Sequence, residues 1–543
     1  MRLRLGLRRL VVLLALLFFA CARFGAGPSD VRRITIVGFS DWHGQLEPVP
    51  VTVGGVTRLL GGAAVLKAYF DRERSQNPSG TLVVTAGDAF GATPPVSSFL
   101  EDVPAVEAQN LLGVDVDTLG NHNFDYGLPR LEKLMALARF PYVAANVVGQ
   151  GGRILVPPSH VFSRNGVQIG VIGIANPETP VVVSPGRVGE YRFLDPAPLI
   201  NRHAASLRGQ GAHLVIVLAH IGASAVTADG KPRGPLGELA RAVRGVDVLI
   251  GDHTDLSVNA MVDDVLVVQS RSKGVEYAVI EVEYDLAHGK VGQRTAVHKR
   301  ALADAIAPDP TLTALVEGYL IQVRPLFDQG IGEAGGRLDR SRAGESLLGN
   351  FVVDAMRAEY GTQLAFTVSG GLRDDLPSSY RPAPRQFRRP QPGYAAGPPW
   401  DLVRGDFFAI FPFGNVAVTF RITGRTLWEA LENSVSQGAV VDGRFTNEAG
   451  RLLQVAGFAY HFDPQRPVGR RVRSVTAADG TPILPDDRMW TAVTIDFAYY
   501  GGDGYSMLNN GTGTTRDPIA ETVARAVGQR IADARLEGRI TVE

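Results

Sequence analysis

The stretch 114-VDVDTLGNHNFD-125 joins a short apolar run to a cluster of side chains that can bind a metal ion. Residues 114–119 predict a buried strand, because apolar and β-branched residues dominate the run. Gly120 ends the run, and an amide (Asn121), an imidazole (His122) and a carboxylate (Asp125) follow within a few residues. A strand that ends in such side chains is typical of an α/β enzyme site.

The same arrangement recurs along the first half of the chain. The other runs that end at or shortly before a possible ligand are 32–39 (followed by Asp41 and His43), 81–86 (Asp88), 214–219 (His220) and 246–250 (His253 and Asp255). Two further predicted strands, 142–146 and 167–174, carry no side chain that we assign to a site. Helical stretches such as 55–74 and 127–139 are expected between the strands. Open α/β sheets place their chemistry at the carboxyl ends of strands, so we expect one site from these distant segments.

The chemical types of these ligands limit which metal ions the site can bind. Carboxylates, an amide and imidazoles without a cysteine favour zinc, manganese, iron or cobalt. The ligands are too many for one tetrahedral ion, and Asp88 stands in the middle of the series, where it can bridge two ions roughly 3.5–4 Å apart. Alternatively, each motif is an ordinary surface loop or a capped core histidine, but that interpretation has to hold for all five segments at once.

These motifs resemble a known family. Asp41-x-His43, Gly87-Asp88, Gly120-Asn121-His122-x-Phe124-Asp125, His220 and Gly251-x-His253-Thr254-Asp255 are similar to the calcineurin-like metallophosphoesterase signature. The motif GNHxFD and the second half of the chain resemble the 5′-nucleotidase branch of this family. That branch also contains UDP-sugar hydrolases and 2′,3′-cyclic nucleotide phosphodiesterases. The resemblance runs from about residue 32 to the C-terminus. It implies an α/β fold, with a four-layer α/β/β/α sandwich over residues 31–305 and an α+β substrate-binding domain over 337–543.

The resemblance also implies two divalent cations, zinc, manganese or cobalt. One would be held by Asp41, His43, Asp88 and Asp255, and the other by Asp88, Asn121, His220 and His253. His122 would stabilise charge that develops on a phosphoryl or leaving-group oxygen, and Asp125 would fix the tautomer of its ring. The family often has His, Asn or Gln where this chain has Asp255, and the extra carboxylate favours a hard ion such as manganese.

The second half lacks such ligands and carries aromatic and glycine-rich motifs, among them Ser369-Gly370-Gly371-Leu372-Arg373, Phe411-Pro412-Phe413-Gly414-Asn415 and Asp496-Phe497 with Gly501-Gly502-Asp503. The resemblance implies that Phe413 and Phe497 stack on a nucleobase, Asp503 holds ribose hydroxyls, and Arg342 and Arg373 hold phosphate, with Asn415 in the same set. Stacking is tolerant of the base, and a guanidinium fork matches phosphate oxygens. Alternatively, the two phenylalanines are ordinary core residues.

Two segments connect or interrupt these halves. Residues 306–336 are expected to form a linking helix, over 308–329, and then a glycine-rich turn over 330–336, because apolar residues in 308–329 recur at helical spacing. Residues 381–400 contain six prolines and several arginines. We expect a mobile surface loop there, with no packed element. This loop either screens the base pocket or is a decoration of the surface with no part in the site.

The first thirty residues indicate export. Four arginines precede the apolar run 10–19, which is too short for a permanent membrane span, and Cys21 follows it. We expect a signal peptide or a lipoprotein signal, with Cys21 as the candidate lipid anchor and the periplasm or cell envelope as the location. Cys21 is the only cysteine, so the mature chain has no intrachain disulfide.

Composition agrees with a globular enzyme. A chain of 543 residues, with 45% hydrophobic and 20% charged residues, is expected to form two or three domains. Its 55 basic and 55 acidic residues balance, which gives no support for binding a nucleic-acid polymer.

The leading hypothesis is an exported, dimetal-dependent nucleotide phosphohydrolase of the 5′-nucleotidase type that releases phosphate from nucleoside 5′-phosphates, with UDP-sugars as a second candidate class of substrate. Alternatives are a 2′,3′-cyclic nucleotide phosphodiesterase with 3′-nucleotidase activity, or a thiosulfohydrolase-like enzyme. A nonenzymatic exported nucleotide-binding protein is a hypothesis of another class, and it requires the loss of metal ligands. None of the ligands is lost here. Oligomeric state stays open.

Overall fold

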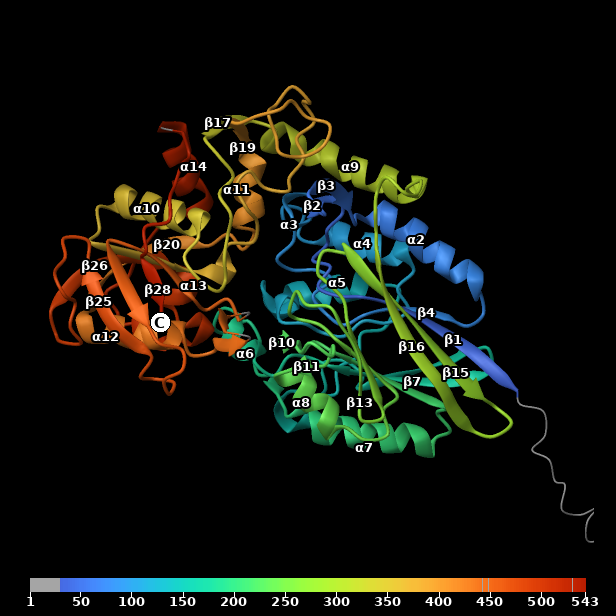
Figure 1. Ribbon diagram of the computed structural model, residues 1–543. Coiled ribbons are helices and arrows are strands. Elements are labelled where there is room, and N and C mark those ends of the chain that lie inside the picture. The colour runs from blue at the N-terminus through green and yellow to red at the C-terminus, as the bar shows by residue number, and fades with distance from the viewer. Residues whose placement is uncertain (1–29, 442, 448, 530) are drawn as a thin grey trace, which may run out of the picture.

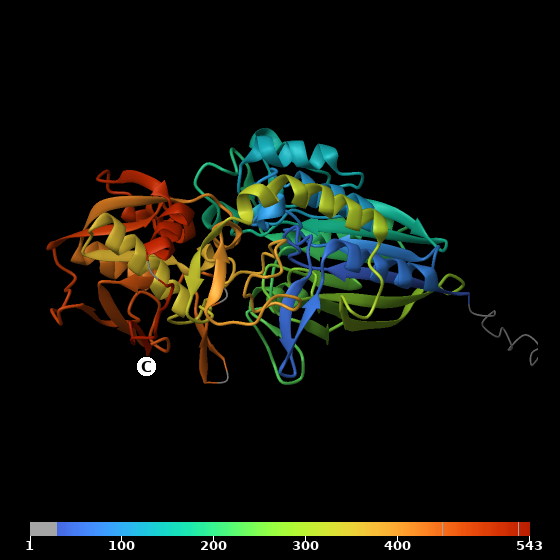
Figure 2. The ribbon, with the colours of Figure 1, turned by 90° about the horizontal axis from the view of Figure 1, so that it is seen from above.

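The chain forms two lobes that lie side by side (Figures 1 and 2). The computed structural model describes residues 30–441, 443–447, 449–529 and 531–543. The predicted export signal therefore lies outside the described residues. Within those ranges no helix is long and apolar enough to cross a membrane.

Two stacked sheets form the centre of the N-terminal lobe. The first has the strand order β16-β15-β1-β4 and the second the order β13-β14-β12-β9-β7-β6. Strands of the first sheet are β1 (Val31–Phe39), β4 (Thr81–Thr85), β15 (Glu276–Asp285) and β16 (Lys290–Arg300); those of the second are β6 (Ser159–Arg164), β7 (Val167–Ile174), β9 (Leu214–Ala219), β12 (Val248–Gly251), β13 (Val258–Val262) and β14 (Val265–Gln269). β1 and β4 run parallel, as do β7, β9, β12 and β14, so their carboxyl ends share one edge of each sheet.

Alternation along the strands explains why the sheets stack. In β9 the side chains of Leu214, Ile216 and Leu218 enter the core between the two sheets, whereas those of Val215 and Val217 pack under helices on the outer face. Successive side chains of a strand point to opposite faces, so a continuous apolar run such as β9 must be covered on both sides.

Helices cover both outer faces. The first sheet is covered by α2 (Ala63–Gln76), α4 (Val103–Leu112), α5 (Leu128–Leu137) and α9 (Pro310–Phe327), and the second by α7 (Pro196–Gly209) and α8 (Pro235–Ala242). The layers are therefore helix, sheet, sheet and helix. This confirms the predicted α/β/β/α sandwich.

Several predicted elements differ in detail. Residues 114–119 and 142–146 are reduced to single parallel bridges, Val84 with Val116 and Asp117 with Tyr142, which continue the first sheet beyond β4. Val56 begins a strand, β3 (Val56–Leu60), that forms a hairpin with β2 (Val49–Val53), and α2 starts only after it. The glycine residues Gly54 and Gly55 make this hairpin turn, a signal that helical spacing alone does not reveal.

The predicted linking helix exists as α9, and its apolar face belongs to the N-terminal lobe. Leu312, Val316, Leu320, Val323 and Phe327 pack into the same core as α2 and α4. The glycine-rich segment that follows was predicted to be a turn and instead begins as a strand, β17 (Gly330–Ala334), which pairs with β19 (Trp400–Val403). Pairing with a distant partner has overridden the local preference of its glycines.

The C-terminal lobe has its own core around a five-stranded sheet in the order β23-β18-β26-β20-β27. The strands are β18 (Leu364–Val368), β20 (Val416–Thr423), β23 (Leu453–Ala456), β26 (Met489–Ile495) and β27 (Thr514–Pro518), and the larger helices are α10 (Leu347–Tyr360), α11 (Arg404–Ile410), α12 (Gly424–Ser434) and α14 (Ile519–Gln529). A smaller sheet joins β25 (Val472–Ala477), β24 (Phe458–Phe462) and β28 (Ile540–Val542). This α+β lobe was predicted from the motifs of the second half.

The proline-rich segment 381–400 forms no helix and only the first residue of β19, as expected, yet it is held firmly. Arg389 is 2% exposed and makes two bonds of 2.7 Å to the carboxylate of Asp406 in α11. Gln391 donates to the carbonyl of Ser378 (2.6 Å). Burying a charged pair is tolerated only with such complete partners, so the prediction of a purely mobile surface loop is wrong.

Candidate metal centre and substrate pocket

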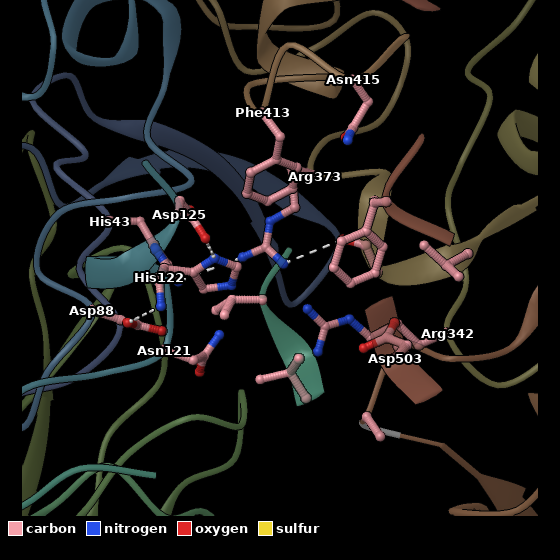
Figure 3. A pocket seen from close by; sticks show the side chains of 18 of the residues that line it. His43, Asp88, Asn121, His122, Asp125, Arg342, Arg373, Phe413, Asn415 and Asp503 are labelled. Atoms are coloured by element: carbon pink, nitrogen blue, oxygen red, sulfur yellow. Dashed lines mark hydrogen bonds and ion pairs between the residues drawn. The ribbon is translucent and has the colours of Figure 1, made fainter. Parts of the chain in front are cut away.

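One cavity of about 540 Å³ lies between the lobes and is lined by both. From the N-terminal lobe it receives Asp41, His43, Asp88, Asn121, His122, Asp125, His253 and Asp255; from the C-terminal lobe it receives Arg342, Arg373, Phe413, Asn415, Phe497 and Asp503. Figure 3 shows the metal-ligand candidates on one side of this cavity and Arg342 with Asp503 on the other. His220 is fully buried directly behind the wall.

The predicted ligands converge in two overlapping groups. Ligand atoms of Asp41, His43 and Asp88 lie within 4.8 Å of one another, as do those of Asp88, His220 and His253. Nε2 of His220 lies 2.9 Å from Oδ2 of Asp88 and 3.1 Å from Oδ1 of Asn121. Asp88 is shared by both groups, which is the place of a ligand that bridges two ions.

Hydrogen bonds behind two of the histidines point their free nitrogens inward. Nδ1 of His43 donates to the carbonyl of Gly91 (2.8 Å), and Nδ1 of His220 donates to the carbonyl of Ala86 (3.0 Å). Each bond fixes the proton on Nδ1 and leaves the lone pair of Nε2 for a metal. Nδ1 of His253 lies 3.3 Å from Nε2 of His220, so the two ring nitrogens face the same point. The donor set therefore fits a pair of divalent ions.

The backbone at the ligands is strained. Asp41, His43, Asp88 and His253 all have positive φ angles, of 40°, 48°, 49° and 82°. Residues with a Cβ avoid this left-handed region, and such strain persists only where the surrounding structure enforces it. Here the enforcing bonds include Ser40 Oγ, which donates to the carbonyl of Gly251 (3.2 Å) and ties the end of β1 to the end of β12.

Two glycines let the ligand loops approach each other. A Cβ at Gly120 would lie 2.1 Å from Oδ1 of Asp88, and a Cβ at Gly87 would lie 2.6 Å from the backbone nitrogen of Gly120. Both distances are far below van der Waals contact. The glycines of the Gly87-Asp88 and Gly120-Asn121 motifs are therefore a steric requirement of the metal centre.

Charges around Asp88 keep it ionised. Burial by itself raises the pKa of Asp88, but the neighbouring imidazoles, His220 foremost, outweigh burial and hold that pKa well below its usual range. For His220 the balance is the reverse, because Asp88 and Asp252 raise its pKa despite burial. Asp88 is therefore anionic, which is the form in which a carboxylate binds a metal.

Asp252 is a buried carboxylate of this centre that the sequence motif leaves unassigned. Its Oδ1 accepts from the backbone nitrogen of His253 (2.9 Å), and its Oδ2 lies 3.7 Å from Nδ1 of His220. Asp252 forms a third convergent group with Asp41 and His220. The sequence could have indicated Asp252 only through its position directly before His253. That position of the motif can be occupied by any residue.

Asp255 has a different environment from the other predicted ligands. Its Oδ1 accepts from the backbone nitrogen and the hydroxyl of Ser272, at 2.9 and 3.0 Å. It lines the cavity but belongs to none of the three convergent groups formed by the described residues. Its assignment as a ligand stays a prediction.

His122 and Asp125 form the predicted pair. Nδ1 of His122 lies 3.1 Å from both carboxylate oxygens of Asp125, so the ring donates from Nδ1 and presents Nε2 to the cavity. The backbone nitrogen of His122 donates to Oδ1 of Asp88 (2.8 Å). This bond holds the ring beside the metal groups without making it a member of either.

Side chains of the C-terminal lobe reach the metal centre directly. The ring of Phe413 stacks on that of His122, with centroids 5.5 Å apart and planes 12° apart. Nη2 of Arg373 lies 3.5 Å from Nε2 of His43, and its guanidinium lies over the ring of Phe413. Tyr126 adds a bond from its hydroxyl to the carbonyl of Pro412 (3.0 Å). The two lobes therefore meet around the cavity.

The far end of the cavity holds the other predicted substrate residues. Phe497 is partly exposed into the cavity, and Asn415 donates to Oδ1 of Asp496 (2.7 Å) in the turn that carries it. Asp503 is 6% exposed, and burial raises its pKa to about 7 while Arg451 and Arg342 oppose the rise. Phe497 and Asp503 thus line the wall of the cavity that the C-terminal lobe provides.

Known proteins share this arrangement. Residues 328–510 match the 5′-nucleotidase C-terminal domain. The whole structure resembles that of a 5′-nucleotidase precursor from Thermus thermophilus, with a TM-score of 0.79 and 29% identity over 94% of this chain and 99% of that one. The chain is therefore similar to 5′-nucleotidases in sequence and in structure, and its second half matches their C-terminal domain.

Sequence relatives extend this finding. A snake venom 5′-nucleotidase from Gloydius brevicauda is 28% identical over 91% of this chain and 85% of its own length. The cell wall protein Lmo0130 of Listeria monocytogenes is 28% identical over 94% of this chain and 69% of its own length. On this similarity the chain is a metal-dependent phosphoric ester hydrolase, and the convergent Asp and His groups are where divalent metal would bind.

The close approach at Gly120 predicts the effect of a single methyl group. Gly120→Ala should push Asp88 out of place, so at least one metal should be lost in elemental analysis and hydrolysis of AMP should fall by roughly a hundredfold or more. Gly318→Ala is the matched control, because a Cβ at Gly318 in α9 meets nothing within 4 Å. A Gly120→Ala protein with full metal content and normal turnover would contradict the steric argument.

Proposed function

We propose that this chain is an exported 5′-nucleotidase that hydrolyses nucleoside 5′-phosphates to nucleosides and phosphate. The observation that carries the proposal is that one cavity is lined by a carboxylate–imidazole metal centre, by arginines and by two partly exposed phenylalanines. A nucleotide needs the same groups, because its phosphate requires cationic neutralisation and its flat base stacks on aromatic faces.

The residues of the metal centre would serve as predicted. Asp41, His43, Asp88 and Asp255 would hold one divalent cation, and Asp88, Asn121, His220 and His253 the other. Such a pair, when bound, supplies the positive charge that activates a water and neutralises the phosphoryl group. Zinc, manganese and cobalt all suit these ligands, and the additional carboxylates Asp252 and Asp255 favour manganese.

His122 would act on the leaving oxygen. Its Nδ1 is committed to Asp125, so only Nε2 faces the substrate. In that position the ring can donate a proton or a hydrogen bond to the oxygen that gains charge as the ester bond breaks. Asp125 keeps the proton on Nδ1 and so sets which nitrogen faces the cavity.

The C-terminal lobe would position the nucleotide. Arg373 projects from a glycine-rich turn to within 3.5 Å of His43, so it can bind a phosphate that rests on the metals. Arg342 would bind the same phosphate from the opposite wall. Phe413 and Phe497 would sandwich the base, and Asp503 would accept hydrogen bonds from the ribose hydroxyls.

Export belongs to the same proposal. The basic and apolar character of residues 1–20 supports a signal, and the name of the Listeria relative describes a cell wall protein. A lipid on Cys21 is the finer alternative to ordinary cleavage. Mass spectrometry of the mature N-terminus would separate the two.

The deciding experiment removes one ring and compares two substrates. Phe497→Ala should raise KM for AMP by roughly ten- to a hundredfold, because stacking is worth about 1–3 kcal/mol. Hydrolysis of p-nitrophenyl phosphate, which has no base, should be nearly unchanged, since the metal centre belongs to the other lobe. Tyr500→Ala is the control, because Tyr500 is 49% exposed and lies outside the cavity wall.

Equal losses on both substrates would mean that Phe497 supports the fold, and the nucleotide proposal would then fail. A panel that includes UDP-sugars, 2′,3′-cyclic nucleotides and a thiosulfonate substrate tests the alternatives with the same protein. A clear preference for one of those compounds over every nucleoside 5′-phosphate would replace the proposed activity.

The role of His122 predicts a loss of rate without a loss of metal. His122→Ala should lower kcat by roughly 10²–10⁴ while elemental analysis shows unchanged metal content. His288→Ala is a matched control, because His288 makes the same kind of bond to an aspartate three residues away, Asp285, at the surface (2.7 Å). Loss of metal in His122→Ala would identify His122 as a ligand instead.

The raised pKa of Asp503 predicts a pH-dependent affinity for adenosine. Its carboxylate is ionised above about pH 7 and accepts ribose hydrogen bonds more strongly in that form, so affinity should rise roughly tenfold from about pH 6 to about pH 8. Adenosine carries no phosphate, which removes the titration of the ligand from the measurement. Calorimetry on Asp503→Asn should show weaker binding without this rise; an unchanged rise in that variant would assign it to another group.

A further inference from the structure

A second cavity, of about 480 Å³, adjoins the substrate pocket. The two cavities share four lining residues, Asp255, Ser272, Lys273 and Arg340. The base-binding candidates Phe413, Phe497 and Asp503 do not line the second cavity. It therefore opens from the substrate pocket at a different place from the base.

The shared wall adjoins the metal centre. The backbone nitrogen of Lys273 donates to the carbonyl of Asp41 (2.9 Å), and Asp255 follows His253 by two residues. The base of a nucleotide whose phosphate is bound at the metals would thus lie on one side of that phosphate. The entrance of the second cavity would lie on the other side. A substituent on that phosphorus, directed away from the nucleoside, would enter the second cavity.

Cations outnumber acids in this cavity. Its charged lining residues are Arg271, Lys273, Arg300, Arg337 and Arg340 against Asp255, Glu276 and Asp374. The acids already accept hydrogen bonds from serines: Asp255 from Ser272, Glu276 from Ser257, and Asp374 from Ser379. Of the five cations, Arg337 alone makes a salt bridge within the described part of the chain, with Asp375.

Among these cations, Lys273 gives the strongest indication of a ligand-binding site. Its side chain is partly buried between the lobes, and among the residues of 30–543 that the structure describes its ammonium group has no hydrogen bond or ion pair. Its φ of 58° is unfavourable for a residue with a side chain. Asp374 and Asp375 act on this charge only from beyond hydrogen-bond distance. A positive charge that is partly removed from water without a directly bonded partner is costly, and together with backbone strain this is typical of a ligand-binding position.

The proline-rich segment completes the cavity. Pro390 and Gln391 line the second cavity, whereas no residue of 381–400 lines the substrate pocket. The buried bond between Arg389 and Asp406 holds this wall in place. The segment was expected either to screen the base pocket or to be decoration, and two of its residues instead line the neighbouring cavity.

We propose that the second cavity is a subsite for an anionic group attached to the reacting phosphorus on the side away from the nucleoside, and that Lys273 and Arg340 bind this group. The inference rests on the proposed nucleotide phosphohydrolase function and extends it to nucleoside diphosphates esterified with an acidic sugar. Water bonds to the phosphorus that carries the sugar, and the bond from that phosphorus to the bridging oxygen breaks. The products are a nucleoside monophosphate and an acidic sugar 1-phosphate.

UDP-glucuronate and UDP-glucose are a matched pair of probes, because they differ only in a carboxylate against a hydroxymethyl group. The metal-loaded protein should cleave UDP-glucuronate with a kcat/KM about tenfold above that for UDP-glucose, the gain expected from one charge-assisted contact. Lys273→Gln should bring this ratio close to one. Lys231→Gln is the control, since Lys231 is exposed and pairs with Asp229 away from both cavities, and it should leave the ratio unchanged.

Using a ratio cancels any effect of Lys273 on the reacting phosphate, which is common to both probes. The subsite is overturned if UDP-glucose is cleaved as well as UDP-glucuronate, if the preference survives in Lys273→Gln, or if neither is cleaved while AMP is hydrolysed. AMP separates the two proposals, because it has no group for the second cavity. Failure to hydrolyse AMP would refute the proposed 5′-nucleotidase function, and the ratio would still decide the subsite wherever the two sugars are cleaved.

Discussion

The structure depends on the position of one carboxylate, that of Asp88. It belongs to both ligand groups, its Oδ1 accepts from the backbone of His122, and its Oδ2 lies 2.9 Å from His220. To reach this place Asp88 adopts a left-handed backbone directly after Gly87 and packs against Gly120, and neither glycine has room for a Cβ. Several parts of the fold, including the parallel strands, the stacked sheets and the tight turns after β1 and β4, bring ligands from distant segments to this carboxylate.

A second constraint is that neither lobe contains the whole site. The N-terminal lobe provides the metal centre and His122, while Arg373, Phe413, Phe497 and Asp503 come from the C-terminal lobe. The stack of Phe413 on His122 and the bond from Tyr126 to Pro412 join the lobes at the cavity itself. A substrate would therefore contact both lobes. Residues of both lobes line the second cavity as well.

Much of the N-terminal lobe could be predicted from the sequence because its strands are buried on both faces. Such strands are continuous apolar runs, as in residues 214–219, and their ends are marked by polar ligands. Runs 114–119 and 142–146 were harder, because whether a run pairs along its length or through one bridge depends on neighbours that sequence periodicity does not reveal. The strand β17 was missed for the same reason, since its partner β19 lies far along the chain.

The site residues were predicted to the extent that a motif names them. The structure brings the ligand candidates together, apart from Asp255, which faces Ser272. Asp252 was missed because it occupies a variable position of the motif. Lys273 was missed because only its backbone conformation, and the absence of an ion pair among the described residues, distinguish it. The anchoring of segment 381–400 was missed too, because proline content reports on local conformation and not on a buried partner such as Asp406.

The central claim is that Asp88 bridges two divalent cations at the junction of the strand ends. The most direct measurement is a crystal structure of the manganese-loaded protein, with anomalous scattering recorded at the manganese edge. We expect two peaks roughly 3.5–4 Å apart, with Asp88 in contact with both. A single peak, or two peaks of which neither touches Asp88, would contradict the account.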